Sequence, residues 1–325
     1  MAMWNIIQNK LKSKLIILLI CCSIFVSCRK EFVIDYPVIP PTLVVNCLFT
    51  NDSVFNIQIG KLQYLNDTTD AIVKNAEVIL YEDNIVFDTL NFNFSDKTYK
   101  SLKKAQIGKN YSIIVKADGF PTISASDKVP DSTHIDSANV YLAAYYDSWE
   151  EMKLEVVNLY FENEEEEENY YEVICYSKET YENSDSTVSQ YFKFPNFITS
   201  LDPVILNEGI LDQNKYQPAL IFGDRFLNSN AKIIFMPFLQ LSNSLYIPES
   251  YVVLRNVSKN YFLFRKKWYK YLQTNAPTQM NGIAQLSNMS FVSDPSEAFS
   301  NIENGLGIFA AYSETQKLMQ LKTEK

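Results

Sequence analysis

The chain has 325 residues, of which 47% are hydrophobic and 14% aromatic, and its formal net charge is −9. This composition can fill a packed core, so it excludes an intrinsically disordered chain. The negative charge argues against nucleic acid as a partner and against electrostatic docking on anionic lipid, because both require basic surfaces. Tyr and Phe, with 21 residues each, and the low Gly count of 8 favour a strand-rich protein.

The N-terminus has the pattern of a lipoprotein signal peptide. Three lysines precede an apolar run that begins at Leu15, and residues 25–28, Phe-Val-Ser-Cys, end it like a lipobox, with Phe25 where leucine is usual. The run of about a dozen residues is short for a membrane span, which needs about 20. We therefore expect residues 1–27 to be removed and Cys28 to carry the lipid anchor. A retained transmembrane anchor is the alternative.

Residues 28–41 are expected to form an extended tether. They contain Pro37, Pro40 and Pro41 and show no helical period. Proline-rich segments extend by about 3.1 Å per residue. The tether would therefore hold the following body away from the membrane.

Two cysteines remain once the signal peptide and the lipidation site are set aside. Cys47 and Cys175 each lie within an apolar, strand-like run, far apart in the sequence. Such surroundings favour two buried free thiols. A disulfide between them, formed in an oxidising envelope, is the alternative.

The first domain is expected over residues 42–130. Strands are predicted over residues 43–49, 76–81 and 111–117, and Phe55, Ile57 and Ile59 alternate with polar residues as in a half-buried strand. Asn, Asp and Gly separate these runs. Short strands at near-regular spacing indicate a small Ig-like β-sandwich.

A polar stretch, residues 127–137, is the expected boundary to a larger β-rich domain over residues 138–325. Strands are predicted over residues 138–146, 152–161 and 170–176. The glutamates of residues 164–168 lie between the last two, which suggests a hairpin with a solvated tip. A calcium loop is the alternative, although the run has neither alternating ligands nor a glycine for the bend.

One amphipathic helix is predicted over residues 257–274 of this domain. Its expected buried stripe recurs at helical spacing and consists of Val257, Tyr261, Phe264, Trp268, Tyr271 and Leu272. Ser258 is the candidate N-cap. Arg265, Lys266, Lys267 and Lys270 are interpreted as a solvated basic face, with docking onto an acidic partner as the alternative.

The sharpest local motif lies near the C-terminus, and its residues are Asn301, Asn304, Gly305, Gly307 and Phe309. Asn-Gly is a strong tight-turn dipeptide, because both residues tolerate positive φ. Gly307 precedes an apolar strand, which suggests close backbone approach. The glycine spacing fits no phosphate-binding loop. We expect a structural turn that leads into a final core strand, with Phe309 in the core.

Two resemblances follow from these segments. Residues 75–78 and 111–120 are similar to a transthyretin-like or carboxypeptidase-regulatory-like sandwich. The whole chain resembles a family of Bacteroidetes-type envelope lipoproteins, domain of unknown function 4249. Its resemblance rests on Cys28 and residues 43–47, 75–78, 169–171, 222–224, 268–272, 291–295 and, most specifically, 301–309.

The family resemblance implies an outer-membrane lipoprotein on either the periplasmic or the surface side. Members often lie beside TonB-dependent outer-membrane transporters, which implies an accessory partner that helps to capture the cargo of such a transporter. The family has no established chemistry, so it implies no catalytic residue. A structural or adhesive envelope protein is the alternative.

The residues themselves do not predict an enzyme. His134 is the only histidine and lies in the expected domain boundary, so a Ser-His-Asp triad and a histidine-based metal site each lack a member. A carboxylate pair for hydrolysis is the enzymatic alternative, but no pair stands out. We therefore expect a non-catalytic protein without cofactor, metal site or nucleic-acid partner.

Overall fold

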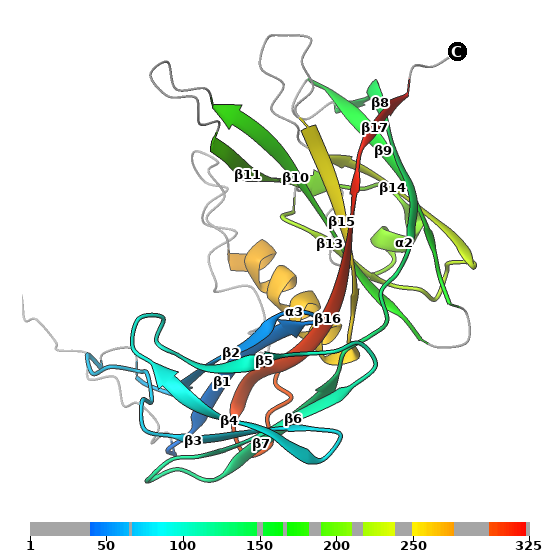
Figure 1. Ribbon diagram of the computed structural model, residues 1–325. Helices are drawn as coiled ribbons and strands as arrows, with labels where there is room; N and C mark the ends of the chain where they lie inside the picture. Colours follow the sequence, from blue (N-terminus) through cyan, green and yellow to red (C-terminus); the bar gives the residue numbers. More distant parts are fainter. Residues whose placement is uncertain are drawn as a thin grey trace, which may run out of the picture. The chain divides into compact units, whose positions relative to one another are not determined.

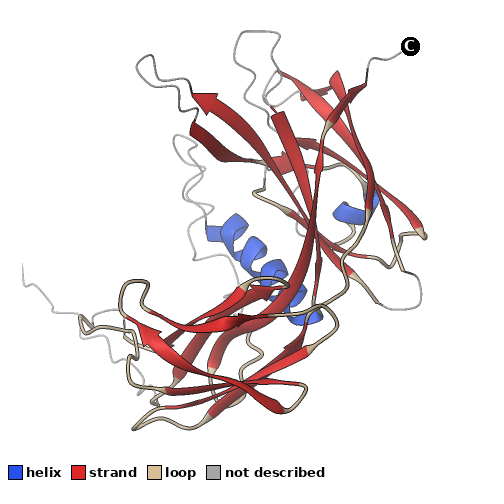
Figure 2. Ribbon diagram, viewed as in Figure 1, coloured by secondary structure: helices blue, strands red, loops and turns tan. Residues whose placement is uncertain are grey.

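The computed structural model describes residues 40–64, 67–147, 152–164, 168–181, 190–209, 217–237, 249–275 and 299–322. Within these ranges the protein is mainly β, which confirms the predicted fold class (Figures 1 and 2). Cys28, the signal peptide and all but the last two residues of the expected tether lie outside the described residues. Their predictions therefore stay predictions.

The N-terminal half contains the strands β1 (Leu43–Thr50), β2 (Val54–Lys61), β3 (Glu77–Glu82), β4 (Ile85–Asn93), β5 (Thr98–Lys104), β6 (Asn110–Lys116) and β7 (Ile123–Lys128). β1 and β2 alternate between buried and more exposed residues, and the sequence predicted this alternation for β2. The sequence did not predict β4, β5 or β7. These strands are rich in polar residues, and Ile85 and Val86 at the start of β4 are exposed.

The C-terminal half contains β8 (Ile135–Asp147), β9 (Met152–Glu162), β10 (Tyr170–Tyr181), β11 (Gln190–Asn196), β12 (Ile198–Thr199), α2 (Pro203–Leu206), β13 (Leu220–Gly223), β14 (Asn230–Pro237), β15 (Glu249–Val257), α3 (Lys259–Asn275), β16 (Leu306–Leu318) and β17 (Gln320–Lys322). The predicted strands correspond to β8, β9 and β10, and the predicted helix to α3. β8 and β10 are longer than predicted, β9 ends one residue later, and α3 begins two residues later and ends one residue later than predicted.

The strands form a 12-stranded and a 5-stranded sheet. The larger sheet has the order β11-β10-β15-β16-β1-β2-β5-β4-β3-β6-β7, with β13 on β10. β16 joins the strands of the two halves, because it pairs in parallel with β1 and antiparallel with β15. Strands from both expected domains therefore share one sheet, and in Figure 1 β16 runs from the region of β1 and β2 to that of β17.

The predicted hairpin across the glutamate run is wrong. β9 pairs with β8 and β14 in the smaller sheet, whereas β10 pairs with β11, β13 and β15 in the larger one. Alternation within a strand predicts which face is buried, but it does not identify the neighbouring strand. The segment that contains the glutamates therefore connects two sheets, and residues 165–167 of it lie outside the described residues.

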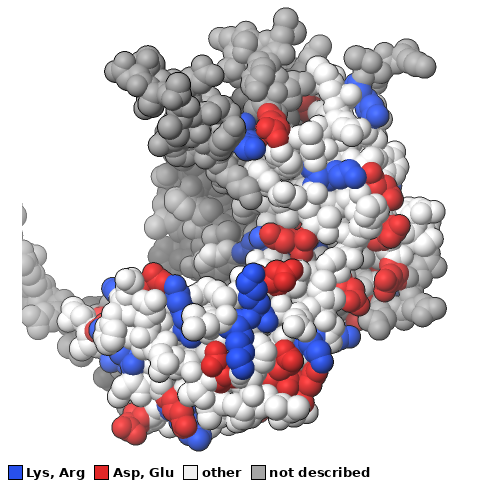
Figure 3. Space-filling model, in the orientation of Figure 1, with Lys and Arg blue, Asp and Glu red and all other residues white. Residues whose placement is uncertain are grey.

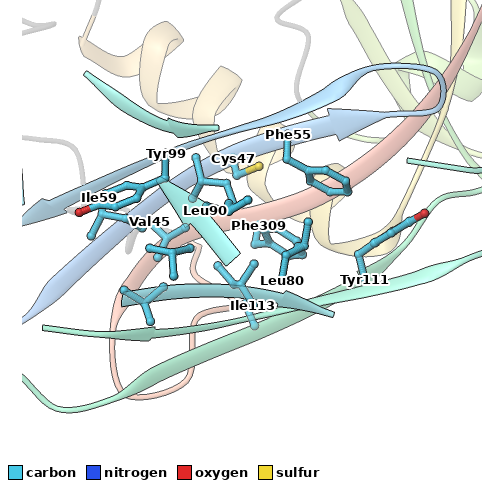
Figure 4. Packing of buried hydrophobic residues seen from close by; sticks show 14 of the residues in the cluster. Val45, Cys47, Phe55, Ile59, Leu80, Leu90, Tyr99, Tyr111, Ile113 and Phe309 are labelled. Atoms are coloured by element: carbon cyan, nitrogen blue, oxygen red, sulfur yellow. The ribbon is translucent and has the colours of Figure 1, made fainter. Parts of the chain in front are cut away.

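The first hydrophobic core fills the space enclosed by β1 to β7 and β16. Side chains from β1, β2, β3 and β6 converge on it (Figure 4). Phe309 of β16 is fully buried in this core, and its ring centroid lies 4.7 Å from that of Phe49. Aromatic pairs at this separation pack favourably beyond the area that they bury.

β16 is buried on both of its faces over residues 308–311. Phe309 and Ala311 contact the first core, whereas Ile308 and Ala310 belong to a cluster beneath α3. A third cluster, which includes Val173 and Val157, lies between the two sheets of the C-terminal half. The double burial explains the continuous apolar run that follows Gly307.

Both remaining cysteines are buried free thiols, so the disulfide alternative is wrong. Burial raises the pKa of Cys47 and of Cys175 well above the ordinary thiol value. The thiolate is the reactive form of cysteine, so both residues serve as small apolar core side chains.

Candidate functional site

Helix α3 positions the polar groups of the candidate site. It begins at Lys259, so Val257, expected in its stripe, lies at the end of β15. The Oγ of Ser258 accepts a hydrogen bond of 3.1 Å from the backbone N–H of Tyr261, as an N-cap does. The start of α3 is thereby fixed directly after β15.

The face of α3 that packs on the sheet differs from the prediction. Tyr261, Phe262 and Tyr269 are its most buried side chains, whereas Trp268 and Tyr271 are 44% and 46% exposed. The rings of Trp268 and Tyr271 stack on each other at 5.8 Å. The helix is rotated from the predicted stripe because a buried carboxylate of the sheet attracts Arg265 and Tyr269.

This carboxylate is Glu172 on β10, which is fully buried. It accepts hydrogen bonds of 2.9 Å from Arg255 on β15 and from Arg265 on α3. The hydroxyl groups of Tyr261 and Tyr269 also donate to it, each at 2.7 Å. Four donors from two elements therefore converge on one carboxylate, which we call the Glu172 cluster.

The charges in the Glu172 cluster are compensated. Burial alone would raise the pKa of Glu172, but Arg265 and Arg255 hold it below the ordinary value. The prediction of a solvated basic face is therefore wrong for Arg265. The sequence did carry a signal, because Glu172 interrupts the apolar strand Tyr-Tyr-Glu-Val-Ile-Cys and a buried acid requires a partner.

A second buried carboxylate lies at the other side of the N-terminus of α3. Asp127, at the end of β7, is 9% exposed and accepts hydrogen bonds from Ser258 Oγ, from Asn260 Nδ2 at 3.1 Å and from the backbone N–H of Ala311 at 2.7 Å. It thus connects β7, α3 and β16. Burial raises the pKa of Asp127 to about 6, although these donors oppose the rise.

Asp127 also lines a pocket of about 620 Å³. The ends of β7, β9 and β15 and the starts of β10, β14 and α3 meet at this pocket. The connections from β7 to β8 and from β9 to β10 also contribute to it. Most of its lining residues carry polar or charged side chains: Asp127, Lys128, Pro130, Asp131, Ser132, Thr133, His134, Glu162, Asn163, Glu164, Glu168, Asn169, Tyr170, Tyr171, Ser229, Asn230, Asn256, Val257, Ser258 and Lys259. We call it the junction pocket, and it is the candidate functional site.

Buried side chains form the floor of the junction pocket. Tyr171 donates a hydrogen bond of 2.8 Å to Oδ1 of Asn163, and Nδ2 of Asn256 donates to the backbone carbonyl of Asp131 at 3.0 Å. Thr133 and Asp127 complete the buried polar groups. These contacts fix the floor on strand ends, which position a site more rigidly than a free loop does.

The sequence did not predict the pocket, although some of its lining residues stood out in the sequence for other reasons. His134, from the expected domain boundary, lines it, as do Glu164 and Glu168 from the two ends of the glutamate run. Because no local motif links residues so far apart in sequence, only the fold brings them together. In the ranges that the structure describes, no three metal-ligating side chains lie together.

The C-terminal motif lies outside this pocket. The side chain of Asn301 donates to the carbonyl of Phe309 at 2.7 Å and accepts from its N–H at 3.0 Å, so it holds the start of β16. Positive φ occurs at Asn304 and Gly307, whereas Gly305, expected to share it, does not have it. A Cβ on Gly307 would lie 1.9 Å from the carbonyl oxygen of Val45.

The surface face in Figure 3 has acidic and basic side chains interspersed, without a large patch of one sign. Among the helices in the described part of the chain, none has the length and apolar character of a membrane span. This face therefore does not by itself identify a partner.

Comparison with known proteins places the chain in a family. A family profile with the description "Domain of unknown function (DUF4249)" matches residues 29–318. This range covers all the strands from β1 to β16, the junction pocket and α3. A comparison with curated proteins found no match. The chain therefore belongs to the family described as Domain of unknown function (DUF4249).

Proposed function

We propose that this protein is a non-catalytic, lipid-anchored cell-envelope protein that helps a TonB-dependent outer-membrane transporter to capture its cargo. The junction pocket is the observation that supports cargo capture. Its volume of about 620 Å³ falls in the range of about 300–1,000 Å³ for small-molecule sites. The lipobox-like N-terminus of the chain supports the lipid anchor, and the family membership of the chain supports the partnership with a transporter.

The arrangement of the pocket favours binding over catalysis. The polar groups of its floor are tied to each other or to the backbone, as in the pairs Tyr171–Asn163 and Asn256–Asp131. Asp127, the floor carboxylate, is engaged by three donors of the protein. These groups are positioned to hold a ligand, whereas a general base needs a lone pair directed at the proton that it removes.

Affinity purification from outer membranes tests the partnership. The full chain with a C-terminal tag is expected to recover a TonB-dependent transporter that an unrelated tagged lipoprotein does not recover. A Cys28→Ala variant tests the anchor, because it is expected to lose incorporation of an alkyne fatty acid and to leave the membrane fraction. Absence of the transporter contradicts the partnership, and label retained by Cys28→Ala contradicts the anchor.

A further inference from the structure

The junction pocket has an excess of negative charge. Its charged lining consists of five carboxylates and two lysines: Asp127, Asp131, Glu162, Glu164 and Glu168 against Lys128 and Lys259. The Nζ of Lys259 lies 3.2 Å from Oε2 of Glu168, so this lysine already has a carboxylate partner. A concave site lined mainly by one sign of charge attracts ligands of the opposite sign. The pocket therefore favours a cation over an anion.

The floor adds hydrogen-bonding atoms that remain open. Asn163 and Asn256 are only 5% and 7% exposed. Among the described residues, the side-chain contacts of Asn163 use only its Oδ1 and those of Asn256 only its Nδ2. Within the ranges that the structure describes, the solvent-inaccessible side-chain atoms that lack a hydrogen-bond partner are Thr98 Oγ1 and Asn139 Oδ1, and no atom of Asn163 or Asn256 is among them. The Nδ2 of Asn163 and the Oδ1 of Asn256 are thus not sealed, and both residues line the pocket.

These two atoms are complementary. Nδ2 of Asn163 is a donor and Oδ1 of Asn256 is an acceptor. An amide group on a ligand carries one carbonyl acceptor and one N–H donor, so it can satisfy both. Two side chains of the lining that keep one donor and one acceptor unused therefore point to an amide-containing ligand.

We propose that the junction pocket binds a small peptide-like cation, in which an amide group lies beside a guanidinium or ammonium group. Asn163 and Asn256 recognise the amide, and the carboxylates of the lining, including Glu162 and Glu164, receive the positive charge. Hydrogen bonds between a cationic donor and a carboxylate are stronger than those between neutral groups. This inference rests on the proposed function and names the class of cargo for it.

Titration calorimetry with two matched tripeptides tests the inference. Glycyl-arginyl-glycine and glycyl-glutamyl-glycine, both with blocked ends, differ in the charge of one side chain. The mature full-length protein is expected to bind the arginine peptide at least about tenfold more tightly, a difference of about 1.4 kcal/mol. Its affinity should fall as salt is added, because salt screens exposed charges.

Three variants locate the binding site. Asn256→Ala is expected to weaken binding of the arginine peptide about tenfold through the lost hydrogen bond. Glu164→Gln, an exposed lining residue, should weaken it without changing the melting temperature. Glu77→Gln is the matched control, because Glu77 lies on β3, pairs with Lys116 and is not part of the lining. It should leave the affinity unchanged.

Each contrary result overturns the inference. Equal binding of both peptides, tighter binding of the glutamate peptide, or binding of neither excludes a peptide-like cation as the ligand. Equal weakening by Glu77→Gln and Glu164→Gln excludes the junction pocket as the site. Recovery of the transporter from membranes tests the proposed function separately, since it can succeed while peptide binding fails, or fail while peptide binding succeeds.

Discussion

Glu172 and Asp127 are two buried carboxylates beside the same helix, and the protein compensates them in opposite ways. Glu172 accepts hydrogen bonds from Arg255 and Arg265, and its pKa is held below the ordinary value. Asp127 is engaged by neutral donors alone, and burial raises its pKa to about 6. Full ionic compensation accompanies a sealed, structural role, whereas partial compensation occurs in the carboxylate that borders the junction pocket.

The largest expected effect is that of Glu172→Gln. The substitution leaves Arg255 and Arg265 without their shared carboxylate, and breaking a buried ion pair typically costs about 3–5 kcal/mol. Urea unfolding should show a loss of this size. Glu314→Gln is the matched control, because Glu314 pairs with the same Arg255 but is 46% exposed, and it should cost less than about 1 kcal/mol. Equal losses in the two variants would contradict the structural role of Glu172.

Asp127→Asn is expected to have a smaller effect. The new amide nitrogen would face the donors of Ser258, Asn260 or Ala311, and leaving such buried donors unsatisfied costs about 1–3 kcal/mol. The same unfolding experiment measures this loss at pH 7. A variant as stable as the native protein would show that the three hydrogen bonds to Asp127 do not stabilise the fold.

The pH dependence separates the two carboxylates, because their pKa values are shifted in opposite directions. The raised pKa of Asp127 means that the folded state holds a proton that the unfolded state has released. The stabilising contribution of Asp127 is therefore fully present below its pKa in the unfolded state, about 3.9. This contribution is lost as the pH rises to about 6. The lowered pKa of Glu172 stabilises the fold above about 4.3 and is lost as the pH falls.

Unfolding measured between pH 3 and pH 7 tests these signs. Asp127→Asn should remove the loss of stability between about pH 4 and pH 6. Glu172→Gln should instead remove part of the loss in acid. The comparison fails if both variants keep the pH profile of the native protein.

Ser258→Ala sharpens the comparison with a smaller expected loss. Ser258 caps α3 through the N–H of Tyr261 and donates to Asp127, and loss of an N-cap side chain costs typically about 1 kcal/mol. Thermal melts measure this loss. In the Asp127→Asn background the additional loss should be smaller, because the Ser258–Asp127 contact is already changed. Strictly additive losses would show that the two residues act independently.

Glu168→Gln should have the smallest effect on stability. Its ion pair with Lys259 is exposed, so the melting temperature should stay within the error of the measurement. Its position in the lining nevertheless predicts weaker binding of the arginine peptide. A stability loss as large as that of Ser258→Ala would contradict the assignment of Glu168 to the rim of the pocket.

The sequence predicted the elements whose pattern is local. The apolar run of β1, the alternation in β2 and the helical spacing around Tyr261 indicated these elements, and Phe309 was expected in a core that it does occupy. The sequence did not predict which strands are neighbours in the sheets. β10 pairs with β15, so Glu172 lies opposite Arg255, and no local pattern carries the identity of a partner some 80 residues away.

The junction pocket was missed for the same reason. Its lining comes from six elements and several of the connections between strands, and Asn163 and Asn256 look like ordinary polar residues at strand ends in the sequence. Gly305 and Gly307 illustrate a smaller limit. The sequence identified the turn and the close backbone approach at Gly307, where a Cβ would lie 1.9 Å from the carbonyl oxygen of Val45. Positive φ, however, falls on Asn304 and Gly307 and not on Gly305.

Hydrogen exchange with and without the blocked glycyl-arginyl-glycine peptide tests the central claim most directly, namely that the junction pocket binds the ligand while the Glu172 cluster only supports the fold. We expect slower exchange on peptide addition in residues 128–134 and 163–164, which line the pocket. Residues 173–176 of β10, beyond Glu172, should exchange at the same rate with and without peptide. Protection confined to other segments, or unchanged exchange in residues 128–134, would contradict the assignment of the binding site.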